Sequence, residues 1–212
     1  MAALTEASPL RLHFPFAADT SLVLRPGLSM ADDSDFFLFC QENSHLRIER
    51  SATGELEIDM PTKSRTSERN ALLTTLLGMW TLQTRLGKSY ESSGGFRLPS
   101  GAIRSPDAAW VSSERLAELT DEQRDGFLPL APDFIVELRS ETDRLSVLQE
   151  KMIEWRDSGV KLGLLIDPIS KTVEIYRING EVIVLRNPDS VDCTPELSGF
   201  LLNIRLLFDI SA

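Results

Sequence analysis

The sequence has few side chains of the kinds that bind zinc, with two cysteines and two histidines among 212 residues. Cys40 and Cys193 lie far apart and neither belongs to a CxxC pair, so they are predicted to be reduced, buried thiols with no zinc site implied. His13 and His45 have no Asp or Cys at ligand spacing, and we expect neither to be catalytic. The glycine-rich phosphate-binding motifs and the GxSxG motif are also missing, which excludes the usual signatures of nucleotide-binding proteins and serine hydrolases.

Long apolar runs are missing as well. No stretch approaches the ~20 apolar residues of a membrane span. The N-terminal residues include an early acid and no apolar run behind a basic cluster, so they do not resemble a signal peptide. The sequence therefore predicts a cytoplasmic protein that does not associate with membranes.

Positive charge is scarce, since 22 Lys and Arg residues stand against 32 Asp and Glu residues, for a net charge of −10. A protein that binds nucleic acid usually has a basic face, because counterion release supplies most of its non-specific affinity. Two interpretations follow. Either nucleic acid is not the ligand, or a local patch on an acidic body binds it, with help from bound metal.

The chain is expected to contain one domain behind a short lead-in. Residues 1–28 look irregular, because Pro9, Pro15 and Pro26 would each interrupt a helix. Residues 29–212 contain no repeat, linker or low-complexity tract, which indicates a single domain.

Apolar spacing within that domain predicts both helices and strands. Helical spacing occurs in three segments, at 32–41, 67–86 and 143–158. Ser29 is a candidate N-cap for the first of these helices, and Gly87 would end the second. Strand patterns occupy 46–50, 55–59, 107–111, 134–138, 161–166, 172–177 and 181–185. This order predicts an α/β (α+β) fold, with a mixed central sheet flanked by helices.

Glu137 interrupts an otherwise apolar strand, Phe134–Leu138. A carboxylate among such neighbours costs several kcal/mol unless it is paired or holds a metal ion. An ion pair with Arg139, two residues further on and on the same face, would satisfy it structurally. A metal ion would satisfy it functionally, and both interpretations stay open.

Asp107 is the acid best placed to share a cation with Glu137. Each of Asp107, Asp133 and Asp189 follows a proline, but only Asp107 begins a predicted strand that can lie next to the strand of Glu137. Adjacent strands are about 4.8 Å apart, whereas Asp133 lies about 13 Å from Glu137 along the same strand. One cation binds oxygens at ~2–2.6 Å, so Asp133 is too distant to share it, and no acidic strand follows Asp189.

Lys151 lies at the border of the apolar face of the helix over 143–158, one turn from both Leu148 and Trp155. Its ammonium group could point over the strand ends and supply a positive charge to the two acids. It could equally extend to solvent, which is the commoner arrangement for lysine.

Three runs of the sequence resemble the Uma2 family (DUF820): FRLPSGAIRSPDAAWV at 96–111, APDFIVELRS at 131–140 and LQEKM at 148–152. The likeness extends from about residue 29 to the end of the chain. The family is placed among restriction-endonuclease-like proteins of the PD-(D/E)XK type. The resemblance therefore implies a restriction-endonuclease-like sheet flanked by helices and Mg²⁺-dependent cleavage of phosphodiester bonds.

The resemblance assigns roles to residues of the three runs. Asp107 takes the place of the motif aspartate and Glu137 that of the second acid. The lysine expected two residues after this acid is replaced by Arg139, which can stabilise a phosphate but, with a pKa above ~12, cannot readily act as a base. The lysine of this family lies on the following helix, where Lys151 stands, and Gln149 is a weaker match to a glutamine of related nucleases.

The implied mechanism is metal-assisted hydrolysis of DNA. Asp107, Glu137 and the Leu138 carbonyl would hold Mg²⁺, or Mn²⁺ in its place, and Lys151 would orient a water or offset developing charge. Glu68 and Asn70, in the first turns of the long helix, are accessory candidates, although the helix dipole explains an acid there equally well. A local phosphate patch could comprise Arg97, Arg104, Arg139 and Arg144, for which solvated loop arginines are an equal alternative.

The first hypothesis is thus a DNA endonuclease, and the resemblance implies a homodimer, because cleavage of both strands often uses two sites. A second hypothesis is a non-catalytic binding protein that keeps the nuclease fold, which the charge of −10 favours. A glycosidase that uses Asp107 and Glu137 as acid and base is less favoured, because no aromatic sugar platform surrounds them.

Overall fold

The computed structural model describes residues 22–24, 32–44, 46–59 and 62–210. Its centre is a six-stranded sheet in the order β11-β10-β9-β8-β7-β4. Strands β8 and β9 are parallel and every other neighbouring pair is antiparallel, so the predicted mixed sheet is confirmed. The strands are β4 (Gly87–Glu91), β7 (Ala108–Ser112), β8 (Phe134–Leu138), β9 (Leu162–Asp167), β10 (Thr172–Arg177) and β11 (Ile183–Arg186).

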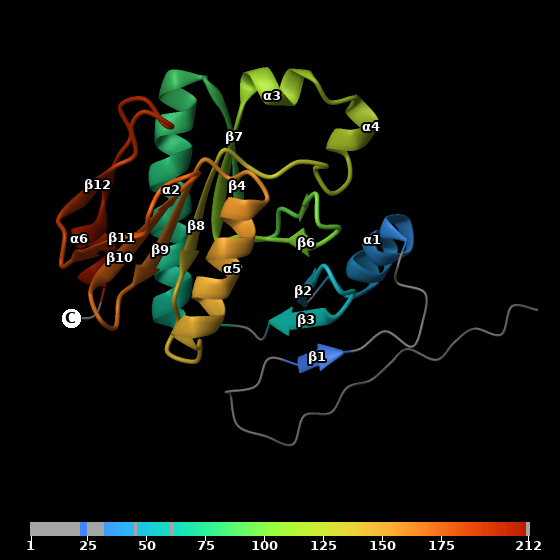
Figure 1. Ribbon diagram of the computed structural model, residues 1–212, viewed down its shortest axis with the longest axis horizontal. Coiled ribbons are helices and arrows are strands. Elements are labelled where there is room, and N and C mark those ends of the chain that lie inside the picture. The colour runs from blue at the N-terminus through green and yellow to red at the C-terminus, as the bar shows by residue number, and fades with distance from the viewer. Residues whose placement is uncertain (1–21, 25–31, 45, 60–61, 211–212) are drawn as a thin grey trace, which may run out of the picture.

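Two helices cover opposite faces of this sheet (Figure 1). Helix α2 (Ser64–Thr84) packs through Leu73 and Leu77 in one core cluster. Helix α5 (Leu145–Asp157) packs through Met152 and Trp155 in another. Successive residues of a strand face opposite sides, and the clusters divide β8 accordingly: alternate residues Phe134, Val136 and Leu138 face α2, and Ile135 faces α5. The same alternation places Glu137 on the α5 face.

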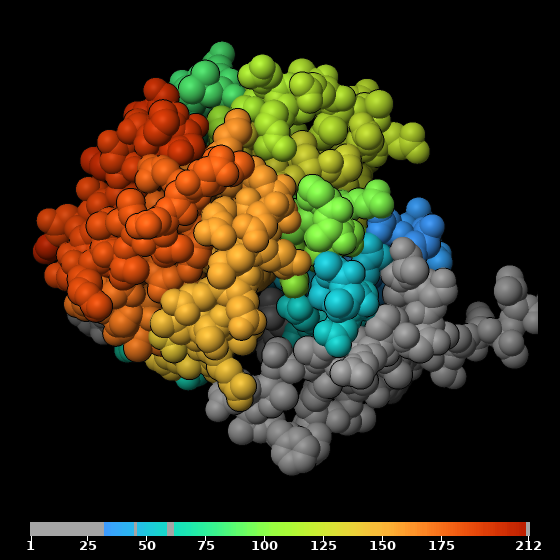
Figure 2. Space-filling model, viewed as in Figure 1, coloured from blue at the N-terminus to red at the C-terminus, as the bar shows by residue number. Residues whose placement is uncertain are grey.

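A smaller sheet lies beside the large one, in the order β1-β3-β2-β6-β5. It comprises β1 (Leu22–Leu24), β2 (Arg47–Arg50), β3 (Leu56–Asp59), β5 (Phe96–Arg97) and β6 (Ile103–Arg104). With helix α1 (Asp33–Glu42) it encloses its own apolar cluster around Phe36, Ile48 and Ile58. Figure 2 shows the β2–β3 hairpin in cyan close to α5 in orange.

The remaining elements pack at the ends of the large sheet. Short helices α3 (Ser113–Ala117) and α4 (Asp121–Arg124) follow β7. The chain closes with the β12 (Ser190–Asp192) and β13 (Leu201–Asn203) pair and helix α6 (Ile204–Phe208), which join the α2-side core. Within the described ranges, no helix is long and apolar enough to cross a membrane.

Several boundaries differ from the sequence predictions. Asp32 caps α1 by accepting a hydrogen bond from the Ser34 N–H at 2.7 Å, whereas Ser29, the predicted cap, lies outside the described residues. Helix α2 ends at Arg85 in the left-handed region, with φ 57°, rather than at Gly87. Gly87 instead begins β4, where a Cβ would lie 2.2 Å from the Val111 carbonyl oxygen, so the sequence needs glycine for close packing.

The lead-in was expected to be irregular, but Leu22–Leu24 form strand β1 and pair with β3. A three-residue edge strand carries too short an alternation to be recognised from sequence. The division into a lead-in over 1–28 and one domain over 29–212 stays a prediction. Both cysteines are free thiols, but only Cys193 is fully buried, and Cys40 is half-buried.

Candidate metal and catalytic site

Asp107 and Glu137 lie side by side where β7 begins and β8 ends. Ala108 pairs with Val136 across the β7–β8 ladder, and Asp107 immediately precedes this pair. The Asp107 Oδ2 accepts a hydrogen bond from the Leu138 N–H at 2.8 Å. In an extended strand the N–H and C=O of one residue point to the same edge, so the Leu138 carbonyl is also directed toward β7. Two carboxylates and one carbonyl thus share this corner of the sheet.

Glu137 is buried at 2% exposure on the face that α5 covers. Its Oε1 accepts hydrogen bonds from the Trp155 Nε1 at 2.9 Å and forms an ion pair with the Lys151 Nζ at 3.0 Å. The structural partner considered from the sequence, Arg139, does not pair with it. Strand β8 ends at Leu138, so Arg139 leaves the alternation and binds the Asp167 carboxylate at 2.7 Å instead.

Lys151 is directed inward rather than into solvent. Its Nζ lies 3.0 Å from the Glu137 Oε1 and 3.0 Å from the Glu49 Oε1. Burial would lower the pKa of this ammonium group, but the two carboxylates more than offset that effect and raise its pKa above the usual range. Lys151 therefore stays charged between two acids that come from different sheets.

Glu49, on β2, was not identified from the sequence. It is 3% exposed, and its Oε1 accepts a hydrogen bond from the Ser105 N–H at 3.0 Å. Its Oε2 lies 3.2 Å from the Arg104 Nη1, and Arg47 is 3.5 Å from Oε1. Charged residues alternate with apolar ones in the β2–β3 hairpin, which predicts that the charged face is exposed to solvent. The packing of the hairpin beside α5 buries Glu49 instead, and the sequence alone does not show this packing.

Arg104 does not belong to an exposed phosphate patch, which was one of the two alternatives for it in the sequence. It is buried at 7% exposure and binds three carboxylates. They are those of Glu49 at 3.2 Å, Glu57 at 2.8 Å and Glu154 at 2.8 Å. Its guanidinium is therefore committed to the interior of the protein. Arg97 is likewise paired, with Asp33 at 2.7 Å, so of the four arginines only Arg144 lacks an ion pair within the described ranges.

Asp107 is held from its other side by Arg47 and Asn70. The Arg47 Nη1 donates to the Asp107 Oδ1 at 3.1 Å, and the Asn70 Nδ2 donates to the same oxygen at 3.2 Å. The Asn70 Oδ1 is buried and has no hydrogen-bond partner among the described residues. Glu68, the other accessory candidate on α2, is exposed, and no hydrogen bond or ion pair links it to the described part of the site.

Gln149 lies apart from the two acids. Its Nε2 donates to the Glu174 Oε1 at 2.8 Å, and the Tyr176 hydroxyl donates to the Glu174 Oε2 at 2.6 Å. This cluster is two strands away from β8, because β9 separates β8 from β10. Gln149 thus shares a helix with Lys151 without reaching Asp107 or Glu137.

The two buried glutamates have opposite pKa shifts. Burial, the Asp107 charge and the Glu49 charge raise the pKa of Glu137 to about 7, although Lys151 opposes them. Burial would also raise the pKa of Glu49, but Lys151, Arg47 and Arg104 lower it to about 2. Carboxylates crowded around one buried point are typical of sites that receive a cation.

The donors at this corner fit a hard divalent cation. They are the carboxylates of Asp107 and Glu137, the Leu138 carbonyl and the unpartnered amide oxygen of Asn70, all oxygens. Mg²⁺ prefers oxygen ligands and is commonly held by one or two carboxylates with several waters. No three His, Cys, Asp or Glu side chains are grouped as a metal cage in the described residues, so protein carboxylates alone would not complete the coordination.

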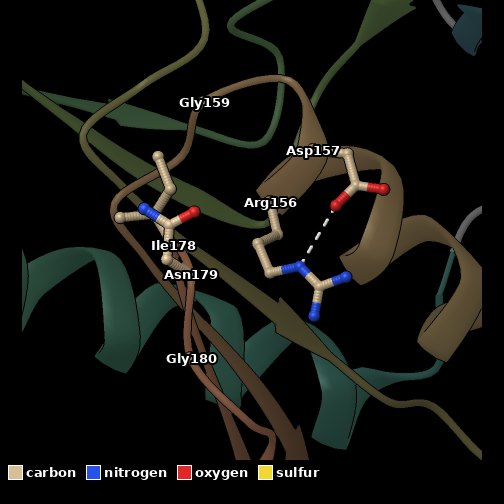
Figure 3. Close-up of a pocket in the computed structure, with 6 residues that line it drawn as sticks. All are labelled: Arg156, Asp157, Gly159, Ile178, Asn179 and Gly180. Carbon is tan, nitrogen blue, oxygen red and sulfur yellow. Dashed lines mark hydrogen bonds and ion pairs between the residues drawn. The ribbon is translucent and has the colours of Figure 1, made fainter.

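A surface hollow lies elsewhere, between the end of α5 and the β10–β11 turn (Figure 3). The Arg156 Nε pairs there with the Asp157 Oδ1 at 3.1 Å. None of the site residues lines this hollow, whose walls are formed by Arg156, Asp157, Gly159, Ile178, Asn179 and Gly180.

Comparison with known families identifies the chain. The Uma2 family, described as "Putative restriction endonuclease", matches residues 33–205. The chain belongs to the Uma2 family. The family description indicates a restriction-endonuclease-like nuclease, in agreement with the sequence resemblance.

A solved structure similar to this Uma2 chain comes from Anabaena variabilis ATCC 29413 and is described as "a putative nuclease belonging to DUF820". The two share 20% sequence identity with a TM-score of 0.66, over 77% of this chain and 90% of the other. At this identity the likeness shows the fold alone, a mixed sheet flanked by helices. A comparison with curated proteins finds no match.

Proposed function

We propose that this Uma2 protein is a Mg²⁺-dependent endonuclease that hydrolyses phosphodiester bonds of DNA. The observation that carries the proposal is the meeting of Asp107 and Glu137 at one strand edge, with the Lys151 ammonium 3.0 Å from the Glu137 carboxylate. Two acids and a lysine are the groups that a metal-assisted phosphodiesterase needs, and the family description supports the same reaction class.

Asp107, Glu137 and the Leu138 carbonyl would hold Mg²⁺, with Mn²⁺ as a substitute. When bound, the ion would supply Lewis-acid polarisation of the phosphate and a water acidic enough to attack near neutral pH. The Leu138 N–H and Asn70 fix the Asp107 carboxylate, and the Trp155 N–H fixes that of Glu137. Such outer hydrogen bonds orient the ligands before substrate arrives.

Lys151 would supply positive charge beside the phosphate. In hydrolysis a water oxygen bonds to phosphorus, the bond to the leaving oxygen breaks, and that oxygen takes up a proton. Negative charge builds on the phosphoryl oxygens during this exchange, and a fixed ammonium group stabilises it. Glu49 holds the ammonium in place through its own contact of 3.0 Å. Arg139 is bound to Asp167 and has no part in this proposal.

The test is nicking of supercoiled plasmid with Mg²⁺ or Mn²⁺, comparing the unmodified protein with Asp107→Ala and Lys151→Ala. Both variants should lose nicking, whereas Lys88→Ala, which removes an exposed lysine on β4, should keep it. Equal nicking by all four proteins would mean that the site is misassigned. Calorimetric titration with Mn²⁺ provides a readout independent of activity, and Asp107→Ala should abolish the binding.

A non-catalytic binding protein is the second candidate, favoured by the net charge of −10. Under this alternative the fold binds a partner and the Lys151–Glu137 pair is structural. It would be supported if Mn²⁺ failed to bind to the unmodified protein while duplex DNA or another partner still did.

Three finer features complete the proposal: a homodimer, which the resemblance implies, and, from the sequence itself, a cytoplasmic location and one domain over residues 29–212. Two copies would supply two sites for the two strands of a duplex. Light scattering of the purified protein would test the dimer, and a mass near that of one 23.7 kDa chain would contradict it.

A further inference from the structure

Basic side chains gather where the two long helices begin, next to the candidate site. Lys63, Arg65 and Arg69 lie at the start of α2, and Arg144 precedes the first residue of α5. We refer to these four residues as the basic rim. Glu68, Glu141 and Asp143 lie among or next to them in the chain and offset three of the four charges, which leaves one positive charge on a protein of net charge −10.

The two helix starts are neighbours in space. The Lys63 Nζ forms an ion pair with the Glu141 Oε2 at 2.6 Å, which joins the start of α2 to the loop between β8 and α5. Figure 1 shows α2 and α5 beginning at the same end of the large sheet. This loop directly follows Glu137 and Leu138, so the rim borders the corner that holds the two acids.

The distance between the basic rim and the candidate site matches a short run of backbone phosphates. Asn70, whose amide binds Asp107, lies seven residues beyond Lys63 on the same helix. At 1.5 Å per residue, the rim is about 10 Å along the axis from that contact. A duplex carries one phosphate per 3.4 Å of axis on each strand, so about three phosphates of a strand would span this length.

Like charges gather here against their mutual repulsion. The pKa of Arg69 is lowered, mainly by burial and also by the neighbouring charge of Arg65. The first turns of α2 and α5 contain no acid, whereas those of α1, α3 and α4 contain one or two acids, and each of these three helices has a side-chain N-cap. The partial positive charges of both helix starts therefore add to the basic side chains rather than being offset. Such an arrangement is stabilised by an anion.

Two of the four residues have their guanidinium groups free for a ligand. Arg69 donates to the Leu207 and Ile210 carbonyls, and Lys63 is engaged with Glu141. Arg65 and Arg144 are exposed, and neither side chain is hydrogen-bonded or ion-paired to a described residue. Arginine binds phosphate through two parallel N–H groups, which suits it to a nucleic-acid backbone.

We propose that the basic rim binds the phosphodiester backbone of the DNA strand next to the scissile phosphate, with Arg65 and Arg144 making the direct contacts. This inference rests on the proposed function and adds to it the surface that holds the substrate. It also explains how an acidic protein engages DNA: a local patch beside the metal site replaces an overall basic charge.

The test is fluorescence anisotropy with a labelled 20-base-pair duplex, measured against salt concentration, in EDTA and again with Ca²⁺. The proteins are the unmodified chain, the double variant Arg65→Ala/Arg144→Ala, and the control Arg186→Ala, which removes an exposed arginine from β11 at the far edge of the sheet. Each lost phosphate contact should reduce the slope of log affinity against log salt by about 0.9, so the double variant should lose about 1.8. The loss should be similar for unrelated sequences, and Arg186→Ala should behave as the unmodified protein.

The outcomes separate the two proposals. If the unmodified protein nicks plasmid and the double variant keeps both its affinity and its salt slope, the basic rim does not bind DNA, and the proposed endonuclease activity is unaffected. An equal loss of salt slope in Arg186→Ala would also overturn the proposal about the basic rim, because the slope would then depend on the total charge of the protein and not on these two arginines. If plasmid is never nicked but DNA binding depends on Arg65 and Arg144, the basic rim binds DNA as proposed, and the proposed endonuclease activity is wrong. If the unmodified protein neither binds nor nicks, both proposals fail.

Discussion

The Lys151 ammonium and the Glu49 carboxylate lie 3.0 Å apart, although 102 residues separate them in the chain. Lys151 belongs to the helix that covers the large sheet, and Glu49 belongs to the small sheet beside it. The same ammonium lies 3.0 Å from Glu137, so one partly buried lysine joins the proposed metal ligand to a second structural unit. The position of Lys151 therefore depends on correct packing of the β2–β3 hairpin against α5.

Replacing Lys151 by methionine should destabilise the protein as well as abolish nicking. Met has nearly the volume of Lys but no charge, so Glu49 and Glu137 would lose the ammonium that they share while remaining buried. Removal of one partner from a buried ion pair costs about 3–5 kcal/mol. We expect the free energy of unfolding in urea, measured at pH 7 in EDTA, to fall by about 3 kcal/mol in Lys151→Met.

The matched control is Lys88→Met, which changes an exposed lysine on β4. It should alter the free energy of unfolding by no more than about 0.5 kcal/mol, as surface substitutions usually do. If Lys151→Met were as stable as this control, the buried ion pairs of Lys151 would contribute nothing to the fold.

The contribution of Glu49 to stability should disappear in acid. Its pKa is about 2 in the folded protein, below the 4.5 of an unperturbed glutamate, because Lys151, Arg47 and Arg104 outweigh the effect of burial, which alone would raise it. A lowered folded pKa adds stability that is present above about pH 4.5 and is lost as the pH falls toward 2. Glu49→Gln should therefore be clearly less stable than the unmodified protein at pH 6, and the difference should shrink steadily between pH 4.5 and pH 3.

Urea unfolding of both proteins in EDTA across this pH range measures the effect. Glu181→Gln, at an exposed position beside β11, serves as the control and should follow the unmodified protein throughout. A stability difference between Glu49→Gln and the unmodified protein that did not change with pH would show that the shape of the side chain matters and its charge does not.

The sequence was sufficient to place Asp107 beside Glu137, because strand order and spacing decide which acids can meet. It also identified the mixed sheet and its two covering helices, since their apolar periods are long and regular. It was not sufficient for Glu49 or Arg104. Periodicity shows that a strand has a charged face, but it does not show whether solvent or another element covers that face.

The partner of Arg139 was also not predictable from the sequence. Alternation placed it on the same face as Glu137, so an ion pair between the two was one of the two interpretations left open by the sequence. The strand ends one residue earlier, and the backbone turns so that Arg139 reaches Asp167. Strand ends depend on tertiary packing, so residues at a boundary are where alternation predicts partners least well.

The Trp155 indole should control how well Glu137 binds a metal ion. Its Nε1 donates to the Glu137 Oε1 at 2.9 Å, and its ring packs against Phe96. Trp155→Phe keeps an aromatic ring and removes the donor, which should lower the Mn²⁺ affinity about 10-fold, as loss of an orienting hydrogen bond commonly does. Calorimetric titration with Mn²⁺ measures this change.

Trp110→Phe is the matched control, because Trp110 is also buried but its Nε1 has no partner among the described residues. Both variants should be destabilised by the smaller ring, by about 1–3 kcal/mol. Only Trp155→Phe should lose Mn²⁺ affinity. Equal affinities in the two variants would mean that the Trp155 hydrogen bond serves packing alone.

Asn70 provides the most direct test of where a metal ion would lie. Its Nδ2 holds Asp107, while its buried Oδ1 has no partner in the described chain. A buried polar oxygen without a partner costs free energy, which a metal ion or one of its waters would recover. Asn70→Ala should therefore reduce Mn²⁺ affinity by about 10- to 100-fold in calorimetric titration. Asn70→Asp keeps an oxygen in place and should bind Mn²⁺ at least as tightly as the unmodified protein. Asn43→Ala removes a half-buried asparagine at the end of α1 and should leave the affinity unchanged. If Asn70→Ala bound Mn²⁺ as tightly as this control, the ion would lie on the far side of Asp107 and the ligand set would have to be redrawn without α2.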